Sequence, residues 1–354
     1  MKILKYLFIL LLLGIISLSV FVATQDGKYT IEHEKISELS DRSLYKYITD
    51  VRNLREWNPW DIKDIKVDSI YSGLGANAQV KNHIFTITEV NPHQQIVYQI
   101  NENESITTLE FNLKPNTDKT TTITLKTSGK LDFIDKFKAL FLGGAKAIVG
   151  APYEKMLNNI NFHLAEDLEK YVLKTQGIVY VPETYFIQQK IVSPIDNLGN
   201  EIFESMKFMK YFVHMNDFIK VTDKPFTFFG QLNMTTDNIE YYVCLPIDKE
   251  IYTAEGSDIT FGKIPAHYAY KTTLTGDYAH SDKAWNKNIE EIKTKNLTNN
   301  TEIQPRAIFQ HSILDTHKPS EWITEFLTPV NESVIPIIEA PNATQNSVES
   351  PTQE

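Results

Sequence analysis

Apolar and polar positions follow different periodicities along this chain of 354 residues. The first segment does not alternate: after Lys2 and Lys5, the residues from Tyr6 to Ala23 are uncharged and mostly apolar. About 18 such residues are just enough for a helix to span a bilayer. A cleaved signal peptide usually has a shorter apolar core and a small-x-small cleavage site, which Phe21-Val22-Ala23 does not supply. We therefore expect residues 1–25 to be a transmembrane anchor, with a signal peptide as the alternative.

The two lysines at the start of this segment indicate its orientation. By the positive-inside rule, Lys2 and Lys5 stay in the cytoplasm and the rest of the chain is exported. In a Gram-negative host this predicts a single-pass protein of the inner membrane, with its soluble domains on the periplasmic, extracytoplasmic side.

From about residue 30 the pattern is that of antiparallel strands with one wetted face. Short segments rich in Thr, Val and Ile alternate with polar residues and are separated by turn signals, as in "HIFTITEVNPHQ". From Asp132 to about Thr175 the spacing becomes helical, with breaks expected at Gly143-Gly144 and at Gly150-Ala151-Pro152. A curved sheet with a long C-terminal helix is an α+β fold. The apolar stripe of that helix comprises Tyr153, Leu157, Ile160, Leu164 and Leu168.

A second unit, residues 178–330, repeats internally as two β-α-β-β halves. Neither half covers its own sheet, so we expect the halves to pack together with a groove between them. The tail, residues 331–354, is polar and rich in Pro and Ser, which predicts disorder. The first half is expected to have strands at 185–192, 226–234 and 239–247 and a helix at 195–214. The second is expected to have strands at 259–275, 306–314 and 322–330 and a helix at 278–293.

Composition narrows the chemistry. The net charge is −10 and no basic run follows the first residues, which argues against a nucleic-acid partner. A single cysteine, Cys244, excludes an intrachain disulfide and a Cys-cluster metal site, and we expect it in the core. The histidines form no H-x-x-x-H or H-x-H pair, and the chain has no phosphate-binding loop and no G-x-S-x-G motif. We expect no metal and no cofactor.

One segment resembles a known superfamily. "ITDVRNLREWNPWD" (residues 48–61) follows a strand and a short helix, and its Trp57 and Trp60 match a Trp-x-x-Trp signature. It is similar to the SRPBCC, or START-like, superfamily, in particular to its polyketide cyclase/dehydrase branch. The resemblance implies a helix-grip domain over residues 30–173, with Trp57 and Trp60 at the mouth of a cavity. Core packing is the alternative for both residues.

A second resemblance covers residues 178–330. "ITFGKIPAHYAYKTTLTGDYAHSDKAWNKN" and "WITEFLTPV" are similar to the GyrI-like small-molecule-binding domain, the effector-binding domain of AraC- and MerR-type regulators. It implies the same tandem β-α-β-β (SHS2-type) halves, a ligand groove between them, and Glu325 at the base of that groove. No DNA-binding unit precedes the domain here, so a role in transcription does not carry over.

Glu325 is the main candidate site residue. In a strand it shares a face with Ile323 and Leu327. A carboxylate among apolar groups loses hydration, and an amphipathic cationic ligand would supply both charge and apolar surface. A structural Glu paired to a donor is the alternative. Some relatives are hydrolases that use this Glu with a Tyr as acid and base, which would be Glu325 and Tyr278 here.

Five aromatic residues are further candidates for ligand contacts, each with core packing as the alternative. Phe309 stands where the family often has Tyr, which weakens the case for hydrolysis. We expect a binding or sensing protein for a hydrophobic or cationic small molecule, with a hydrolase or a protein-partner module (through the groove or an exposed strand edge) as alternatives. The five residues are Tyr268, Tyr270, Tyr278, Trp285 and Phe309; Phe228 and Tyr241 are further candidates for the groove wall.

Overall fold

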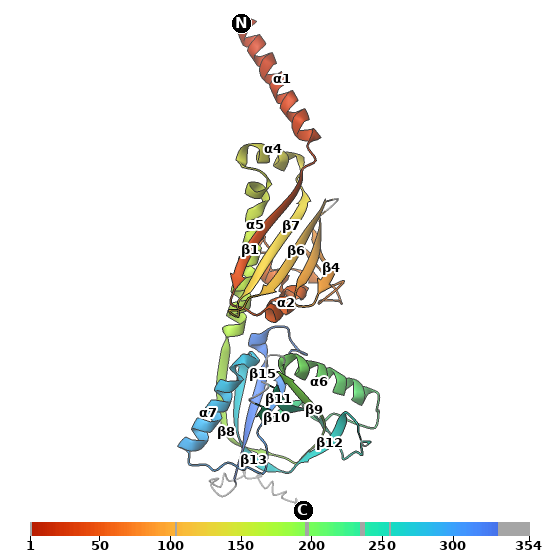
Figure 1. The fold of residues 1–354 in the computed structure, drawn as a ribbon, viewed down its shortest axis with the longest axis vertical. Helices are drawn as coiled ribbons and strands as arrows, with labels where there is room; N and C mark the ends of the chain where they lie inside the picture. The colour runs from red at the N-terminus through yellow and green to blue at the C-terminus, as the bar shows by residue number, and fades with distance from the viewer. Residues whose placement is uncertain (1, 103–104, 195–197, 234–237, 255, 332–354) are drawn as a thin grey trace, which may run out of the picture. The chain divides into compact units, whose positions relative to one another are not determined.

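The computed structural model describes residues 2–102, 105–194, 198–233, 238–254 and 256–331. The chain divides into two compact units, Met1–Asp167 (unit 1) and Leu168–Glu354 (unit 2). Each unit has one antiparallel sheet and its own helices (Figure 1), so the predicted α+β fold class is confirmed. The predicted disordered tail, residues 331–354, lies outside the described residues except for its first residue.

Helix α1 (Lys2–Thr24) carries the apolar N-terminal run. The stretch Ile3–Thr24 is long enough to cross a membrane, and a window of 18 residues within it has a mean hydropathy of 2.7. Among its described side chains, Val22 alone is fully buried. By length and composition α1 is a candidate membrane span. A signal sequence near the N-terminus would pass the same test.

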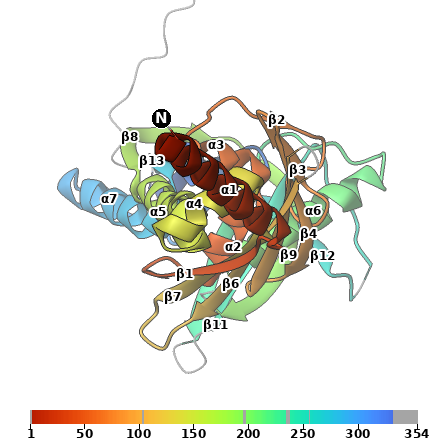
Figure 2. The same ribbon diagram turned by 90° about the horizontal axis from the view of Figure 1, so that it is seen from above.

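Unit 1 has a seven-stranded sheet in the order β1-β7-β6-β5-β4-β3-β2, with helix α5 lying along it (Figures 1 and 2). Three residues of the predicted apolar stripe, Leu157, Ile160 and Leu164, are buried. Met156 of α5 is buried as well. The remaining elements are β1 (Lys28–Ser37), α2 (Asp41–Thr49), η1 (Val51–Asn53), α3 (Leu54–Trp57), β2 (Lys66–Val67), β3 (Asn77–Val80), β4 (His83–Asn91), β5 (Gln95–Glu102), β6 (Ser105–Pro115), β7 (Thr121–Lys130), α4 (Phe133–Leu142) and α5 (Ala145–Glu169).

The long helix predicted from Asp132 to Thr175 is two helices and the start of a strand. Gly143 and Gly144 separate α4 from α5 because both adopt positive φ, as expected for a glycine C-cap. The break expected at Pro152 is wrong: this residue lies inside α5, where the buried stripe that follows holds the helix together. After Glu169 the chain forms strand β8, which begins inside the segment predicted to be helical, because β8 pairs with β13.

Unit 2 has an eight-stranded sheet in the order β12-β9-β11-β10-β14-β15-β13-β8. Its two halves have the predicted β-α-β-β order, and antiparallel pairing of β10 with β14 joins them. The elements are β8 (Tyr171–Val181), β9 (Thr184–Pro194), α6 (Leu198–His214), β10 (Phe226–Asn233), β11 (Asn238–Ile247), β12 (Ile259–Ile264), β13 (His267–Gly276), η3 (Tyr278–His280), α7 (Ser281–Thr294), β14 (Arg306–His311), η4 (Pro319–Glu321) and β15 (Ile323–Val330).

The edge strands of unit 2 are exchanged between the halves. β8 precedes the first half but pairs with β13 of the second, while β12 precedes the second half and pairs with β9 of the first. The single strand predicted at 259–275 is therefore β12 and β13, separated by Pro265-Ala266. Proline has no N–H for a ladder hydrogen bond, so the chain can leave one edge there and cross to the other.

The strand registers assign each residue of this sheet to one of two faces. Helices α6 and α7 pack on the face that carries Tyr241, Val243 and Phe326, which we call the helix face. We call the other one the opposite face. It carries two apolar groups, Phe186, Phe226 and Cys244 in the first and Val181, Ala269 and Leu327 in the second.

Asn288 fixes α7 on the helix face. Its side chain is fully buried, and Nδ2 donates to Phe326 O at 3.0 Å, to Thr328 Oγ1 at 3.2 Å and to Tyr270 O at 3.3 Å. One amide thus connects the helix to both β13 and β15.

Replacing Asn288 by Ala should lower the free energy of unfolding by about 1–3 kcal/mol, because buried carbonyl and hydroxyl groups lose their donor. Urea unfolding of the full chain measures the change. Asn286→Ala is the matched control, since Asn286 lies on the exposed side of the same helix. Equal effects of the two substitutions would show that the buried amide does not hold α7.

Candidate functional site

Glu325 lies on the opposite face of the unit 2 sheet. The register sets it beside Thr273 of β13 and Ile308 of β14, and alternation places Ile323 and Leu327 on the same face. The face expected for Glu325 within its own strand is therefore the observed one, and the residues on the neighbouring strands define its surroundings.

The carboxylate of Glu325 has two partners. Lys271 Nζ lies 2.5 Å from Oε1, and Gln310 Nε2 donates to Oε2 at 3.1 Å. The side chains of Lys271 and Glu325 are 22% and 16% exposed, so the ion pair is largely removed from water. The prediction of a cationic ligand depends on an unpaired carboxylate at Glu325. In the structure a lysine of the neighbouring strand balances that negative charge.

Arg306 is a second charged residue on this face. It lies opposite Leu327 on one side and Phe228 on the other, and it is 3% exposed. Its guanidinium carbon lies 5.6 Å from the centre of the Phe226 ring. Nη1 is buried and has no hydrogen-bond acceptor among the described residues.

Burial lowers the pKa of Arg306 to about 10, although the nearby Cys244 and Asp223 favour the charged form. The group therefore remains a cation at neutral pH, in surroundings that do not compensate it fully. An uncompensated buried charge destabilises a fold, so such a residue is a candidate for ligand recognition.

His267 adds a polar atom near this arginine. Its Nδ1 lies 2.8 Å from Pro265 O, which makes Nδ1 the protonated nitrogen. Its Nε2 is buried without a partner among the described residues. Burial lowers the pKa of His267, and the positive charge of Arg306 lowers it further, so the ring is neutral at pH 7.

Sequence reasoning missed Lys271, Gln310, Arg306 and His267. The available signal was the period of two in "HYAYKTTLTG", where Lys271 alternates with Tyr270 and Thr272. Without the register, that pattern does not show which set of residues faces Glu325.

The five predicted aromatic contacts lie on the helix face instead. Tyr270 and Tyr268 pack with Ile292 of α7, and Trp285 packs edge-on against Phe326 at 4.8 Å between ring centres. Tyr278 stacks on Trp322 at 4.6 Å and meets Phe309 edge-on at 5.4 Å. Their contacts are those of core residues, and the structure does not bring them together with Glu325.

The acid–base pair considered for a hydrolase is divided by the sheet. Tyr278 packs against the α6 cluster, which also holds Phe309, and burial raises its pKa. Glu325 lies on the other side of the sheet. The two side chains do not converge on one pocket, so this structure does not provide that pair with a shared substrate position.

In unit 1, the side chain of Trp57 is fully buried. Its ring packs edge-on against Phe85, Tyr98 and Phe111, with ring centres 5.8–6.5 Å apart. Trp60 is exposed and stacks on His83 at 3.9 Å. The Trp-x-x-Trp segment thus contributes one side chain to the core and one to the surface.

One hollow lies between β9 and α6, away from Glu325. It has a volume of about 390 Å³. Carboxylates of α6 and the exposed end of β9 form its walls. The lining residues are Gln189, Lys190, Ile191, Val192, Glu201, Glu204, Ser205 and Phe208.

Comparison with known families gives one match. Residues 38–138 match the model of the family described as activator of Hsp90 ATPase homolog 1-like protein, which is of the SRPBCC type. The match falls within the segment 30–173 and agrees with the kind of domain predicted there. Comparison with curated proteins finds no match.

Solved structures resemble this chain at low identity. The EcmrR C-terminal domain is 19% identical, with a TM-score of 0.36, over 46% of this chain and 98% of its own. EcmrR in a complex with DNA is 16% identical, with a TM-score of 0.38, over 56% and 77%. A protein of unknown function from Staphylococcus aureus is 16% identical, with a TM-score of 0.32, over 40% and 96%. Similarity this low carries no statement about function.

Breaking the Lys271–Glu325 pair should destabilise unit 2. Lys271→Met or Glu325→Gln alone should each cost about 1–3 kcal/mol, because each leaves a largely buried group without its partner. The double substitution should cost clearly less than the sum of the single ones. Urea unfolding of the four proteins gives this coupling energy.

The exposed pair Lys263–Glu183, 2.9 Å apart, is the matched control. Its coupling should be much smaller, as is usual for pairs in water. Similar coupling for both pairs would mean that Lys271 and Glu325 gain nothing from burial.

Proposed function

We propose that this protein is a membrane-anchored small-molecule-binding protein, with its ligand site on the opposite face of unit 2. One observation carries the proposal: three largely buried charged side chains, Glu325, Lys271 and Arg306, lie on the sheet face that also carries the two apolar groups. Charges in such a place reduce the stability of the fold. Convergent polar groups among apolar ones are typical of ligand sites. The resemblance of residues 178–330 to effector-binding domains supports the same function.

The charges on this face favour an amphipathic ligand with an acidic group. Lys271 and Arg306 supply two positive charges against one from Glu325. Arg306 also offers a buried Nη1 with no described acceptor, and a carboxylate could accept from it. A lipophilic cation is the ligand expected from Glu325 alone. It would have to displace the ammonium group of Lys271 from the Glu325 carboxylate.

The anchor in this proposal is α1, the candidate span. Lys2 and Lys5 precede the apolar stretch, so by the positive-inside rule we expect both units on the extracytoplasmic side. In unit 1, the match to an SRPBCC-type family agrees with a role in holding apolar molecules. Other aromatic rings pack around Trp57 and fill the space beside it. For this reason we place the ligand site in unit 2.

The test compares ligands of matched shape and opposite charge. The full chain in nanodiscs is heated with naphthylacetate or with naphthylmethylammonium, because a ligand that binds only the folded state raises the unfolding temperature. We expect the acid to stabilise the wild type by a few degrees, which corresponds to roughly 1–3 kcal/mol. Arg306→Met and Lys271→Met should remove this shift, and Lys263→Met should keep it.

Stabilisation by the amine that Glu325→Gln removes would overturn the charge we assign to the ligand and would leave the site in place. No shift with acids or amines in any variant would reject the site itself.

A protein partner is the second candidate, and the hollow beside β9 favours it. β12 covers β9 only as far as Gln189, so Lys190–Pro194 has no strand on that side among the described residues. Open strand edges accept extended peptides, and Glu201 and Glu204 in the hollow favour a basic one. Glu204→Lys should then abolish capture of such a peptide, and unchanged capture would exclude this edge.

A further inference from the structure

Helix α4 keeps its apolar side chains on the surface of unit 1. No residue of this helix is buried. At 3.6 residues per turn, five large apolar side chains fall within an arc of about 120°, which is the width of a stripe that normally faces a core. All five are exposed: Phe133, Ile134, Phe137, Leu140 and Phe141.

The strand register holds α4 beside the end of α1. Lys28 of β1 pairs with Lys130 of β7. Helix α1 ends at Thr24, shortly before this pair, and α4 begins at Phe133, shortly after it. A few residues of extended chain reach about 10 Å, so the end of α1 and the start of α4 must be neighbours.

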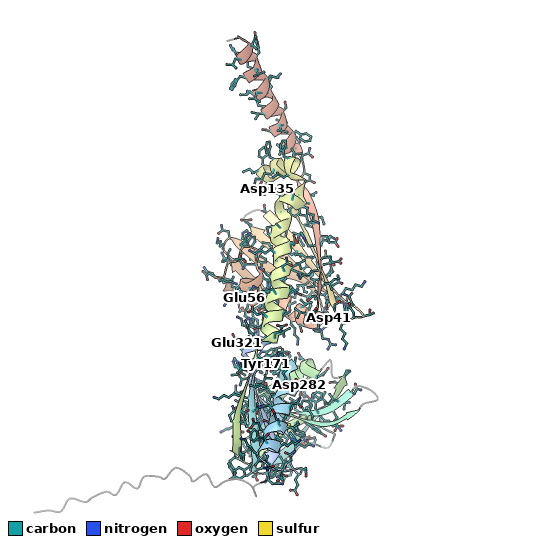
Figure 3. All side chains as sticks on the ribbon, turned by 90° about the vertical axis from the view of Figure 1, so that its left-hand side faces the viewer. Asp41, Glu56, Asp135, Tyr171, Asp282 and Glu321 are labelled. Atoms are coloured by element: carbon teal, nitrogen blue, oxygen red, sulfur yellow. The ribbon has the colours of Figure 1, made fainter. Side chains whose placement is uncertain are left out.

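Direct contacts fix the same arrangement. Lys136 Nζ of α4 donates to Gln25 O at 2.6 Å, and Leu131 N–H donates to Gly27 O at 2.9 Å. Figures 1 and 2 show α4 next to α1 in both views, and Figure 3 labels Asp135 on α4. If α1 crosses a bilayer, α4 therefore lies where that bilayer meets water.

We propose that α4 is an interfacial helix that lies in the surface of the membrane crossed by α1, with its three phenylalanines toward the acyl chains. The inference rests on the proposed anchoring by α1. Short helices with an aromatic apolar face and flanking lysines bind membrane surfaces in this way. Lys136 and Lys138 flank the apolar arc here, and Lys138 pairs with Asp135 at 2.9 Å.

Local hydrogen bonds stabilise both ends of α4. Asp132 caps its first turn by accepting from Asp135 N–H at 2.7 Å, and Gly143, at φ 93°, ends it with a hydrogen bond to Ala139 O. The lipid covers a face that the chain leaves open, and it is the same lipid that covers α1. This continuity with the candidate span selects lipid as the occupant.

The test measures the depth of single labelled positions in the full chain. Phe141→Cys in a Cys244→Ala background carries an environment-sensitive fluorophore, and the protein is reconstituted into liposomes whose lipids bear nitroxides on their acyl chains. We expect most of the fluorescence at position 141 to be quenched. Ile36→Cys is the matched control, because Phe141 and Ile36 are both 65% exposed, but Ile36 lies near the far end of β1.

A third position separates the inference from the anchoring. Leu12→Cys reports on the middle of α1. Quenching at 12 and 141 but not at 36 supports the interfacial helix. Quenching at 12 alone overturns it while the anchor stands, and no quenching at 12 overturns the anchor and the inference together.

Discussion

Antiparallel pairing of β10 with β14 is the interaction on which unit 2 depends. It joins two β-α-β-β halves into one sheet, so both halves share the same two faces. The side-chain period of two then assigns every residue to the helix-covered side or to the other side. Through this single pairing, Arg306 of one half lies beside Phe226 and Phe228 of the other.

Periodicity was enough to predict the fold class. Strand alternation and the repeat of two halves gave the α+β class, and alternation within β15 placed Ile323, Glu325 and Leu327 on one face. Pairing register was not readable, because a shift of one residue exchanges the faces of a whole strand. The tyrosines of β13 were therefore predicted to lie near Glu325, whereas its partner is Lys271, which follows Tyr270 in the sequence. β8 was missed because its helical neighbour α5 continues almost to its first residue.

The charges on the opposite face show why one residue cannot define a site. Considered without its neighbours, Glu325 suggests a binding site for a cationic ligand. In the structure its carboxylate accepts from Gln310 and pairs with the ammonium group of Lys271. The charged group that lacks a full set of partners among the described residues is Arg306. Burying an arginine whose Nη1 has no acceptor among the described residues is more costly than burying a satisfied pair, so selection for stability alone would not be expected to keep it.

The exchange of β8 and β12 has a consequence for the origin and integrity of unit 2. Each half receives its outer strand from the segment that precedes the other half. A chain with only one half would expose two unpaired edges, and a second copy of the same half would complete both. The tandem arrangement therefore has the architecture of a homodimer fused into one polypeptide. Proteolysis between the halves would leave two fragments that remain interlocked rather than two separable domains.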